Sequence, residues 1–144
     1  MTANSIDILV RGILIQNGKV LLLKRTPEKG SGYNLVGGHV EKGESPAAGL
    51  VREILEEIGV MVEASEVELI RVVYREKELS NPKLHLVFWV SNWEGTPMNM
   101  EPKKCLGIQW FALDQLPSEL ATVAGIVLRA GQDDPFYMEI RKRL

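Results

Sequence analysis

GHVEKGESPAAGLVREILEEIGV, residues 38–60, predicts a glycine-containing loop that leads into one capped helix. Ser45 is a favourable N-cap, and Pro46 suits the first helical position because its missing N–H would be unpaired there. Gly59 supplies the left-handed residue that ends a helix. Between these caps, apolar residues recur at helical spacing: Ala47, Leu50, Val51, Ile54 and Ile58. They predict a helix with one face in the core.

The opposite face of this helix is acidic. Glu53, Glu56 and Glu57 stand at i, i+3 and i+4, so their carboxylates emerge within ~5–6 Å of one another. Like charges at that spacing repel, whereas clustered carboxylate oxygens suit a hard cation such as Mg²⁺ or Mn²⁺, which bridges to phosphates. The alternative interpretation is a solvated acidic face. The glycine loop, the extra Glu44 and Arg52, which can hold a carboxylate with two hydrogen bonds, favour a metal site.

The spacing of the glycines and charged residues resembles the signature of the Nudix hydrolases. The positions that match it are Gly38, Glu44, Arg52, Glu53, Ile54, Glu56, Glu57, Gly59 and Val60. Many family members have proline before the paired glycines, where this chain has Val36. The resemblance implies an α/β (α+β) Nudix fold, in which a mixed β-sheet is sandwiched between α-helices.

Composition sets the broad class. A chain of 144 residues fits a single domain, residues 1–144, with one core. The net charge of −2 gives no general attraction to a nucleic-acid polymer or an anionic membrane. The single cysteine, Cys105, excludes an internal disulfide and fits a reducing compartment. Without a signal-like N-terminus or a long apolar run, we expect a cytoplasmic protein.

The rest of the chain predicts a strand-rich domain with a second helix. Asn17-Gly18 between two apolar runs predicts a hairpin, and the continuous apolarity of those runs predicts strands covered on both faces. Further strands are expected at residues 60–62, 67–75, 84–90 and 108–112. The second helix is expected from Ser118, as N-cap, to about Ala130, followed by a docked C-terminal tail.

Downstream motifs narrow the resemblance. Glu101-Pro-Lys-Lys-Cys105, Trp110 and Asp134-Pro-Phe136 look like the MutT-like branch, which hydrolyses purine nucleoside triphosphates, including oxidised ones such as 8-oxo-dGTP. This resemblance implies Mg²⁺-dependent (or Mn²⁺-dependent) cleavage of a (deoxy)nucleoside triphosphate to monophosphate and pyrophosphate. The implied partner is a small nucleotide. A homodimer is compatible with this branch, although no interface is evident in the sequence.

The site residues follow from the residue types and from the family. The expected metal ligands are Gly37, Gly38, Glu53, Glu56 and Glu57, with the family supporting Glu53 and Glu57 most directly. Glu44 and Arg52 are expected to orient these ligands through an ion pair, with direct phosphate contact by Arg52 as an alternative. The general base stays open between Glu53 and Glu101.

The substrate-binding residues are harder to assign. Lys24 and Arg25 stand at the end of a strand, and one of them, with Arg25 preferred, is expected to contact phosphate. Surface solubility is an equally good interpretation of both. Asn34 and Leu35 are the expected base contacts, because an amide both donates and accepts hydrogen bonds. Local turn formation by Asn34 is an equally good interpretation. Other side chains with competing interpretations as core or ligand groups are His39, His85, Trp89, Trp93 and Trp110.

Two rival functions remain. One is a pyrophosphatase for ADP-ribose, dinucleoside polyphosphates or nucleotide sugars, for which Tyr74 is the one supporting residue. The other is a non-catalytic nucleotide sensor, although such domains often lose acidic residues that this chain retains. Substrate turnover separates these hypotheses.

Overall fold

The chain begins with a hairpin. In the computed structural model, which describes residues 5–142, β1 (Asp7–Gln16) and β2 (Lys19–Arg25) are joined by Asn17 and Gly18. Both turn residues have positive φ angles, 54° and 75°, as a two-residue hairpin turn requires. Val20, Leu21 and Leu22 are fully buried on consecutive positions. The prediction of strands covered on both faces is therefore confirmed for β2.

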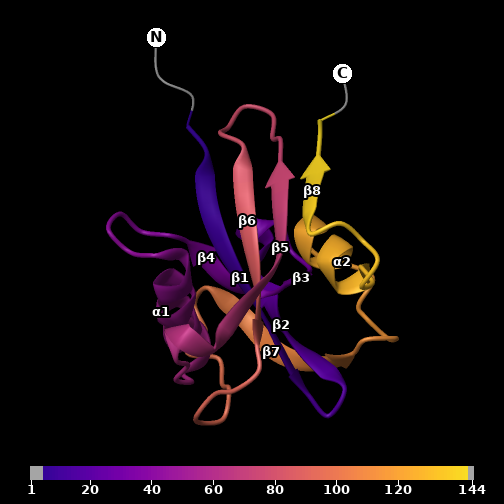
Figure 1. Cartoon of the computed structure of the whole chain (residues 1–144). Coiled ribbons are helices and arrows are strands. Elements are labelled where there is room, and N and C mark those ends of the chain that lie inside the picture. Colours follow the sequence, from indigo (N-terminus) through magenta and orange to yellow (C-terminus); the bar gives the residue numbers. More distant parts are fainter. Residues whose placement is uncertain (1–4, 143–144) are drawn as a thin grey trace.

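Within residues 5–142, eight strands form one mixed sheet, whose arrangement is drawn in Figure 1. The other strands are β3 (Tyr33–Asn34), β4 (Val36–His39), β5 (Val67–Arg75), β6 (Lys83–Val90), β7 (Cys105–Ala112) and β8 (Tyr137–Ile140). The main order is β3-β2-β1-β6-β5-β8, with β4 paired to β1 and β7 paired to β2. The pairs β1–β6 and β5–β8 are parallel, and the others are antiparallel. Two short 3₁₀ helices, Pro27–Lys29 and Ala64–Glu66, lie in the connections.

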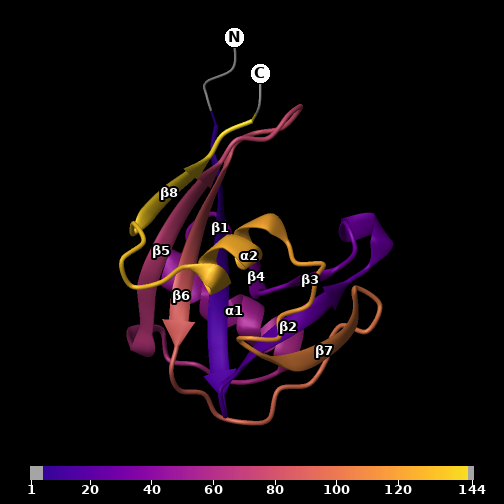
Figure 2. The same cartoon turned by 90° about the vertical axis from the view of Figure 1, so that its right-hand side faces the viewer.

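Two helices cover opposite faces of this sheet. In the view turned by 90°, α2 (Thr122–Arg129) lies in front of the strands and α1 (Pro46–Ile58) behind them (Figure 2). Leu50, Ile54 and Ile58 of α1 pack on one buried cluster, and Val123 and Val127 of α2 pack on the other. The fold is thus the mixed sheet between helices that the sequence led us to expect.

Helix α1 has the predicted boundaries. The Oγ of Ser45 accepts a hydrogen bond from the backbone N–H of Ala48 at 3.1 Å, and Pro46 occupies the first turn. Gly59 ends the helix with a φ of 73° and donates its N–H to the carbonyl of Leu55. The helix defined by these caps carries its acidic face beside β4.

The expected start of the second helix was wrong. Ser118 is not its N-cap, because the chain from Glu119 to Ala121 stays extended and pairs with Tyr33 of β3. That pairing uses the backbone groups which a longer helix would need, and α2 begins only at Thr122. The strand expected at residues 60–62 is likewise reduced to one bridge between Met61 and Glu94.

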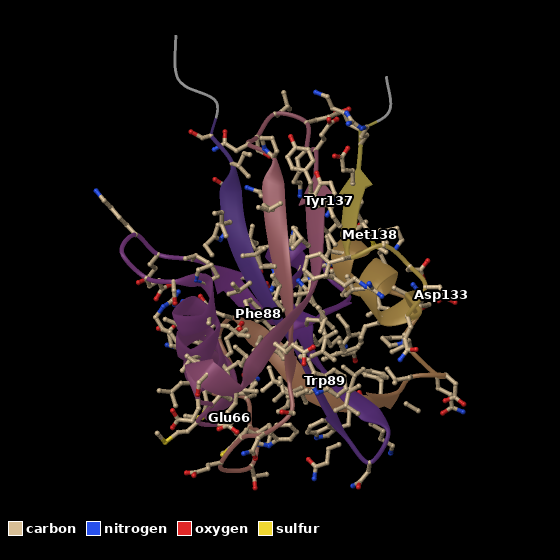
Figure 3. All side chains as sticks on the ribbon, in the orientation of Figure 1. Glu66, Phe88, Trp89, Asp133, Tyr137 and Met138 are labelled. Carbon is tan, nitrogen blue, oxygen red and sulfur yellow. The ribbon has the colours of Figure 1, made fainter. Side chains whose placement is uncertain are left out.

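The aromatic residues and the tail occupy structural positions. Trp93 stacks on Trp110, with ring centroids 6.3 Å apart. Phe88 is buried, whereas Trp89 is partly exposed near the lower end of the sheet (Figure 3). The docked tail is β8, which adds to the sheet edge, while residues 143–144 lie outside the described part. Within residues 5–142, no helix is long and apolar enough to cross a membrane.

Candidate active site

The junction of β4 and α1 holds the acidic side chains against a glycine pair. The carboxylate of Glu57 accepts a hydrogen bond from the backbone N–H of Gly37, N to Oε1 2.8 Å. Gly37 has a φ of 147°, and a Cβ there would lie 1.9 Å from the carbonyl oxygen of Val10. Only glycine fits this position, because both the backbone conformation and the neighbouring strand exclude a side chain.

Gly38 leaves room for the second carboxylate. A Cβ at Gly38 would lie 2.6 Å from Oε1 of Glu53, closer than real atoms approach. The absent side chain therefore creates the space in which Glu53 sits. Glu53 and Glu57, one turn apart on α1, flank the same short piece of β4.

Arg52 connects the acidic residues to one another. Its Nε and Nη2 donate to the two oxygens of Glu44 at 3.1 and 2.7 Å, a two-pronged ion pair with both side chains mostly buried. Its Nη1 donates to Glu53 at 3.0 Å and approaches Glu56 at 3.4 Å. Hydrogen bonds from Arg52 hold the pKa of Glu44 well below its usual range, at about 2. Its Nη2 also donates to the carbonyl of His39 at 3.1 Å, so Arg52 ties the carboxylates to the end of β4.

The electrostatics of Glu57 fit a site that receives a cation. The pKa of Glu57 is raised to about 7, chiefly by burial and also by the charges of Glu53 and Glu101, while the hydrogen bond from the Gly37 N–H and the charge of Arg11 oppose the shift. A carboxyl group that is costly to ionise in the protein alone is stabilised as a carboxylate when a divalent ion binds beside it.

The donor atoms suit a hard cation of the magnesium type. Glu53, Glu57 and the carbonyl groups of Gly37 and Gly38 supply oxygen only, and Mg²⁺ keeps several waters in addition to few protein ligands. Among residues 5–142, no three acidic, histidine or cysteine side chains already converge on one point. Glu56 is half exposed and turned toward Arg52, so the structure brings Glu53 and Glu57 together more closely than Glu56.

A cleft of about 360 Å³ opens beside these carboxylates. Its lining includes Glu57, Gly37 and Gly38 at the acidic end. The basic residues that line it are Arg11, Lys24, Arg25, Lys29 and Lys104. A cleft lined by the carboxylate of Glu57 and by five basic side chains suits a polyphosphate whose charge is shared between protein cations and a metal ion.

The predicted substrate contacts lie in this cleft. Arg25, Asn34 and Leu35 all line it, as does His39. The Oδ1 of Asn34 accepts a hydrogen bond from the backbone N–H of Leu35 at 2.8 Å, the local turn interaction that competed with base binding. Glu101 approaches Lys104 at 3.8 Å and acts electrostatically on Glu57, so it lies near the site.

Comparison with known proteins establishes the family. The family model described as NUDIX domain matches residues 8–130, most of the chain. The chain is a Nudix hydrolase. This Nudix hydrolase is 26% identical over 119 residues to the 8-oxo-dGTP diphosphatase of Escherichia coli, covering 78% of this chain and 88% of that protein. It is 32% identical over 113 residues to the oxidized purine nucleoside triphosphate hydrolase of Danio rerio, covering 76% of this chain and 69% of that protein.

A solved structure supports the same family assignment. A MutT NUDIX hydrolase from Burkholderia pseudomallei superposes on this Nudix hydrolase with a TM-score of 0.79 at 29% identity, covering 87% of this chain and 97% of that one. The chain is therefore an enzyme of a family with pyrophosphohydrolase members, and the family acts on small nucleotide substrates.

Sequence reasoning missed Arg11 of the Nudix domain. This residue lies on β1 among apolar neighbours, lines the cleft and donates from Nη1 to the carbonyl of Leu35 at 3.2 Å. Burial lowers its pKa, while Glu57 and Glu53 act in the opposite direction. The available signal was a lone arginine inside a run that otherwise predicts a buried strand, where a charge needs a specific partner.

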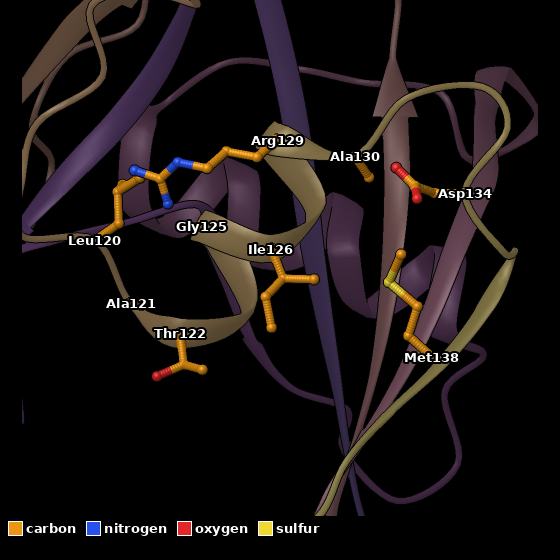
Figure 4. Close-up of a pocket in the computed structure, with 9 residues that line it drawn as sticks. All are labelled: Leu120, Ala121, Thr122, Gly125, Ile126, Arg129, Ala130, Asp134 and Met138. Atoms are coloured by element: carbon orange, nitrogen blue, oxygen red, sulfur yellow. The ribbon is translucent and has the colours of Figure 1, made fainter.

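A second hollow of this Nudix hydrolase, about 410 Å³, lies between α2 and the segment that leads to β8. Figure 4 shows Arg129 extending along α2 toward Leu120, with Asp134 and Met138 on the opposite side. None of the residues of the acidic face of α1 lines it. The second helix thus borders this hollow, and its residues do not line the cleft beside Glu57.

Proposed function

We propose that this protein is a Mg²⁺-dependent pyrophosphohydrolase that converts a (deoxy)nucleoside triphosphate, including oxidised purines such as 8-oxo-dGTP, to monophosphate and pyrophosphate. The observation that carries the proposal is the placement of Glu53 and Glu57 against Gly37 and Gly38 at the acidic end of a basic cleft. The similarity to enzymes named for 8-oxo-dGTP and for oxidised purine triphosphates supports this substrate class.

Glu53, Glu57 and the Gly37 or Gly38 carbonyl would hold the metal, and the half-exposed Glu56 would add a third carboxylate nearby. A divalent ion, Mg²⁺ or Mn²⁺, supplies charge neutralisation of the phosphates and lowers the pKa of bound water. Arg52 and Glu44 hold the ligands in place. Since each carboxylate then accepts fixed hydrogen bonds, little reorganisation is needed when substrate arrives.

The cations of the cleft orient the polyphosphate. Arg25 and Arg11 approach from neighbouring strands, and Lys24, Lys29 and Lys104 add positive charge at the rim. With the phosphates held, water attacks phosphorus directly and no covalent enzyme intermediate forms. Glu53 or Glu101 accepts the proton of that water. Among residues 5–142, the carboxylate of Glu101 pairs with Lys104 at 3.8 Å through Oε2 and that of Glu53 with Arg52 through Oε1, so each keeps one oxygen free for this role.

A substrate panel tests the proposal. Purified protein is mixed with Mg²⁺ and 8-oxo-dGTP, dGTP, CTP, ADP-ribose or a dinucleoside tetraphosphate, and products are resolved by phosphorus NMR. We expect pyrophosphate and a nucleoside monophosphate from the triphosphates. Preferred turnover of ADP-ribose or the dinucleoside compound would replace this substrate class, and binding without any turnover would indicate a nucleotide sensor.

A further inference from the structure

The connection between β6 and β7, residues 91–104, is anchored to the C-terminal end of α1 (Figure 1). The backbone N–H of Met98 donates to the carbonyl of Ile58 at 3.0 Å. Two residues further on, the N–H of Met100 donates to the carbonyl of Glu57 at 3.1 Å. Carbonyls in the last turn of a helix have no partner within the helix itself. The connection therefore caps α1 at the very residue that carries the Glu57 carboxylate.

The packing of Met100 supports the same anchoring. Its side chain lies over Gly59, where a Cβ would approach the Cγ and Sδ of Met100 to 3.1 Å. Gly59 also ends α1 with its left-handed φ of 73°. One glycine thus ends the helix and leaves room for the connection that packs beside it.

Glu101 comes directly after Met100 and begins a tight turn. Its carbonyl accepts hydrogen bonds from the N–H groups of Lys104 and Cys105, at 2.8 and 2.9 Å. Cys105 is the first residue of β7, and it lines the cleft together with Lys104 and Glu57. The backbone of Glu101 is therefore held between the end of α1 and the lining of the cleft.

The side chain of Asn99 closes this turn. Its Oδ1 accepts a hydrogen bond from the backbone N–H of Glu101 at 3.1 Å, and its Nδ2 donates to the carbonyl of Cys105 at 2.8 Å. A backbone N–H can only donate and a carbonyl can only accept, so these two partners fix the direction of the amide. Asn99 thus ties the first residue of the turn to the last.

The charge of Glu101 acts on the carboxylates of the site. The pKa of Glu57 is raised chiefly by burial and then by the charges of Glu53 and Glu101. The side chain of Glu101 is 30% exposed, and its Oε2 approaches Lys104 at 3.8 Å. The backbone contacts and the electrostatic effect agree in bringing Glu101 close to Glu57.

The proposed metal ligands separate the two candidate proton acceptors. Glu53 would bind the divalent ion, and a cation beside a carboxylate favours its charged form and so weakens it as a base. Glu101 is not among the proposed ligands, so its carboxylate stays more basic. This difference favours Glu101 as the general base.

We propose that Asn99 is a positioning residue for Glu101: the two hydrogen bonds of its amide hold Glu101 beside Glu57, where Glu101 accepts the proton of the attacking water. This rests on the proposed hydrolysis and deepens it, because it chooses Glu101 over Glu53 as the proton acceptor. Asn99 does not line the cleft and acts only through the turn that it closes.

A double-mutant cycle on the best substrate of the panel tests the coupling. Glu101→Gln should lower kcat at least about 100-fold and change KM by no more than about 3-fold, because glutamine cannot take up the proton. Asn99→Ala should lower kcat about 10-fold in the wild type, but less than about 2-fold in Glu101→Gln. Asn92→Ala, at an exposed position of the same connection, is the control and should leave kcat unchanged.

Two results of this cycle would overturn the proposal. One is an equal loss of kcat from Asn99→Ala with and without Glu101, since Asn99 would then act by another route. The other is near-normal kcat in Glu101→Gln. Circular dichroism checks that each variant is folded.

Mn²⁺ binding gives a second readout that needs no turnover. Free Mn²⁺ is followed by electron paramagnetic resonance in protein without nucleotide. A nearby carboxylate attracts the ion, so Glu101→Gln should weaken Mn²⁺ binding about 3- to 10-fold. Asn99→Ala should weaken it when Glu101 is present and should have no effect in Glu101→Gln. Equal Mn²⁺ affinities in the wild type and both single variants would contradict the placement of Glu101.

These outcomes are distinct from failure of the proposed function. If no compound of the panel is hydrolysed, the activity is wrong, while the Mn²⁺ affinities still decide whether Asn99 positions Glu101. If hydrolysis occurs and the two substitutions act independently, the activity stands and the positioning role of Asn99 is wrong.

Discussion

The carboxylate of Glu57 accepts a hydrogen bond from the backbone N–H of Gly37, with N and Oε1 2.8 Å apart. This bond joins α1, which carries the acidic side chains, directly to β4, which carries the glycine pair. This contact positions a partly buried carboxylate at the end of the cleft before any ligand arrives. Because Gly37 cannot carry a side chain, the strand approaches closely enough to make the bond.

Glu57→Gln should reduce kcat by at least about 100-fold while the protein stays folded, because glutamine still accepts the Gly37 N–H but is a poor ligand for Mg²⁺. Steady-state kinetics over a range of Mg²⁺ concentrations, with circular dichroism for folding, provide the measurement. Glu68→Gln, at an exposed position on β5, is the matched control. Near-normal turnover by Glu57→Gln would refute a ligand role.

Alanine substitutions at Gly37 and Gly38 should affect different properties, stability for Gly37 and activity for Gly38. Gly38→Ala forces the flexible Glu53 side chain to move, so activity should fall by at least about 10-fold with stability changed by about 1 kcal/mol or less. Gly37→Ala collides with the backbone of Val10 at a positive φ and should destabilise the protein by several kcal/mol or prevent folding. Urea unfolding and kcat measure both effects. Equal activity in Gly38→Ala and the wild type would contradict the placement of Glu53.

Arg52→Lys should lower kcat/KM about 10- to 100-fold and raise the Mg²⁺ concentration needed for half-maximal activity. Lysine cannot donate from two nitrogens to both oxygens of Glu44, so the carboxylates lose their common anchor. Arg71→Lys is the control, because among residues 5–142 the Arg71 guanidinium donates only to backbone carbonyls of the segment before β8. An unchanged Mg²⁺ dependence would show that Arg52 acts elsewhere, for instance on phosphate.

The buried His85 should make the metal-free protein sensitive to acid. Its pKa is lowered to about 3 in the folded state from an ordinary value of 6.5, so the unfolded chain binds the proton more readily. The free energy of unfolding is therefore not reduced by His85 above pH 6.5 and falls as the pH drops toward 3. Between pH 6.5 and pH 5 this fall is about 2 kcal/mol.

Urea unfolding in phosphate-free buffer at several pH values measures this loss. His85→Leu should remove the corresponding part of the pH dependence, and His39→Gln should leave it in place. If His85→Leu has the same pH profile as the wild type, the histidine is not responsible.

Local sequence determined much of this protein. Ser45, Pro46 and Gly59 define α1 because capping depends on residues next to one another in the chain, and Asn17-Gly18 defines the first hairpin for the same reason. The glycines, the glutamates and Arg52 within residues 38–60 identified the family. Their spacing is visible in the sequence because they all lie on one helix and the loop before it.

Tertiary structure decided the rest. Ser118 did not cap α2, because the following residues pair with Tyr33, a partner far away in the chain. Strand pairing also brought Arg11 of β1 to the cleft beside Glu57, because β1 pairs with β4. Local spacing carries helix periodicity and caps, whereas the charge that surrounds a substrate depends on which strands become neighbours.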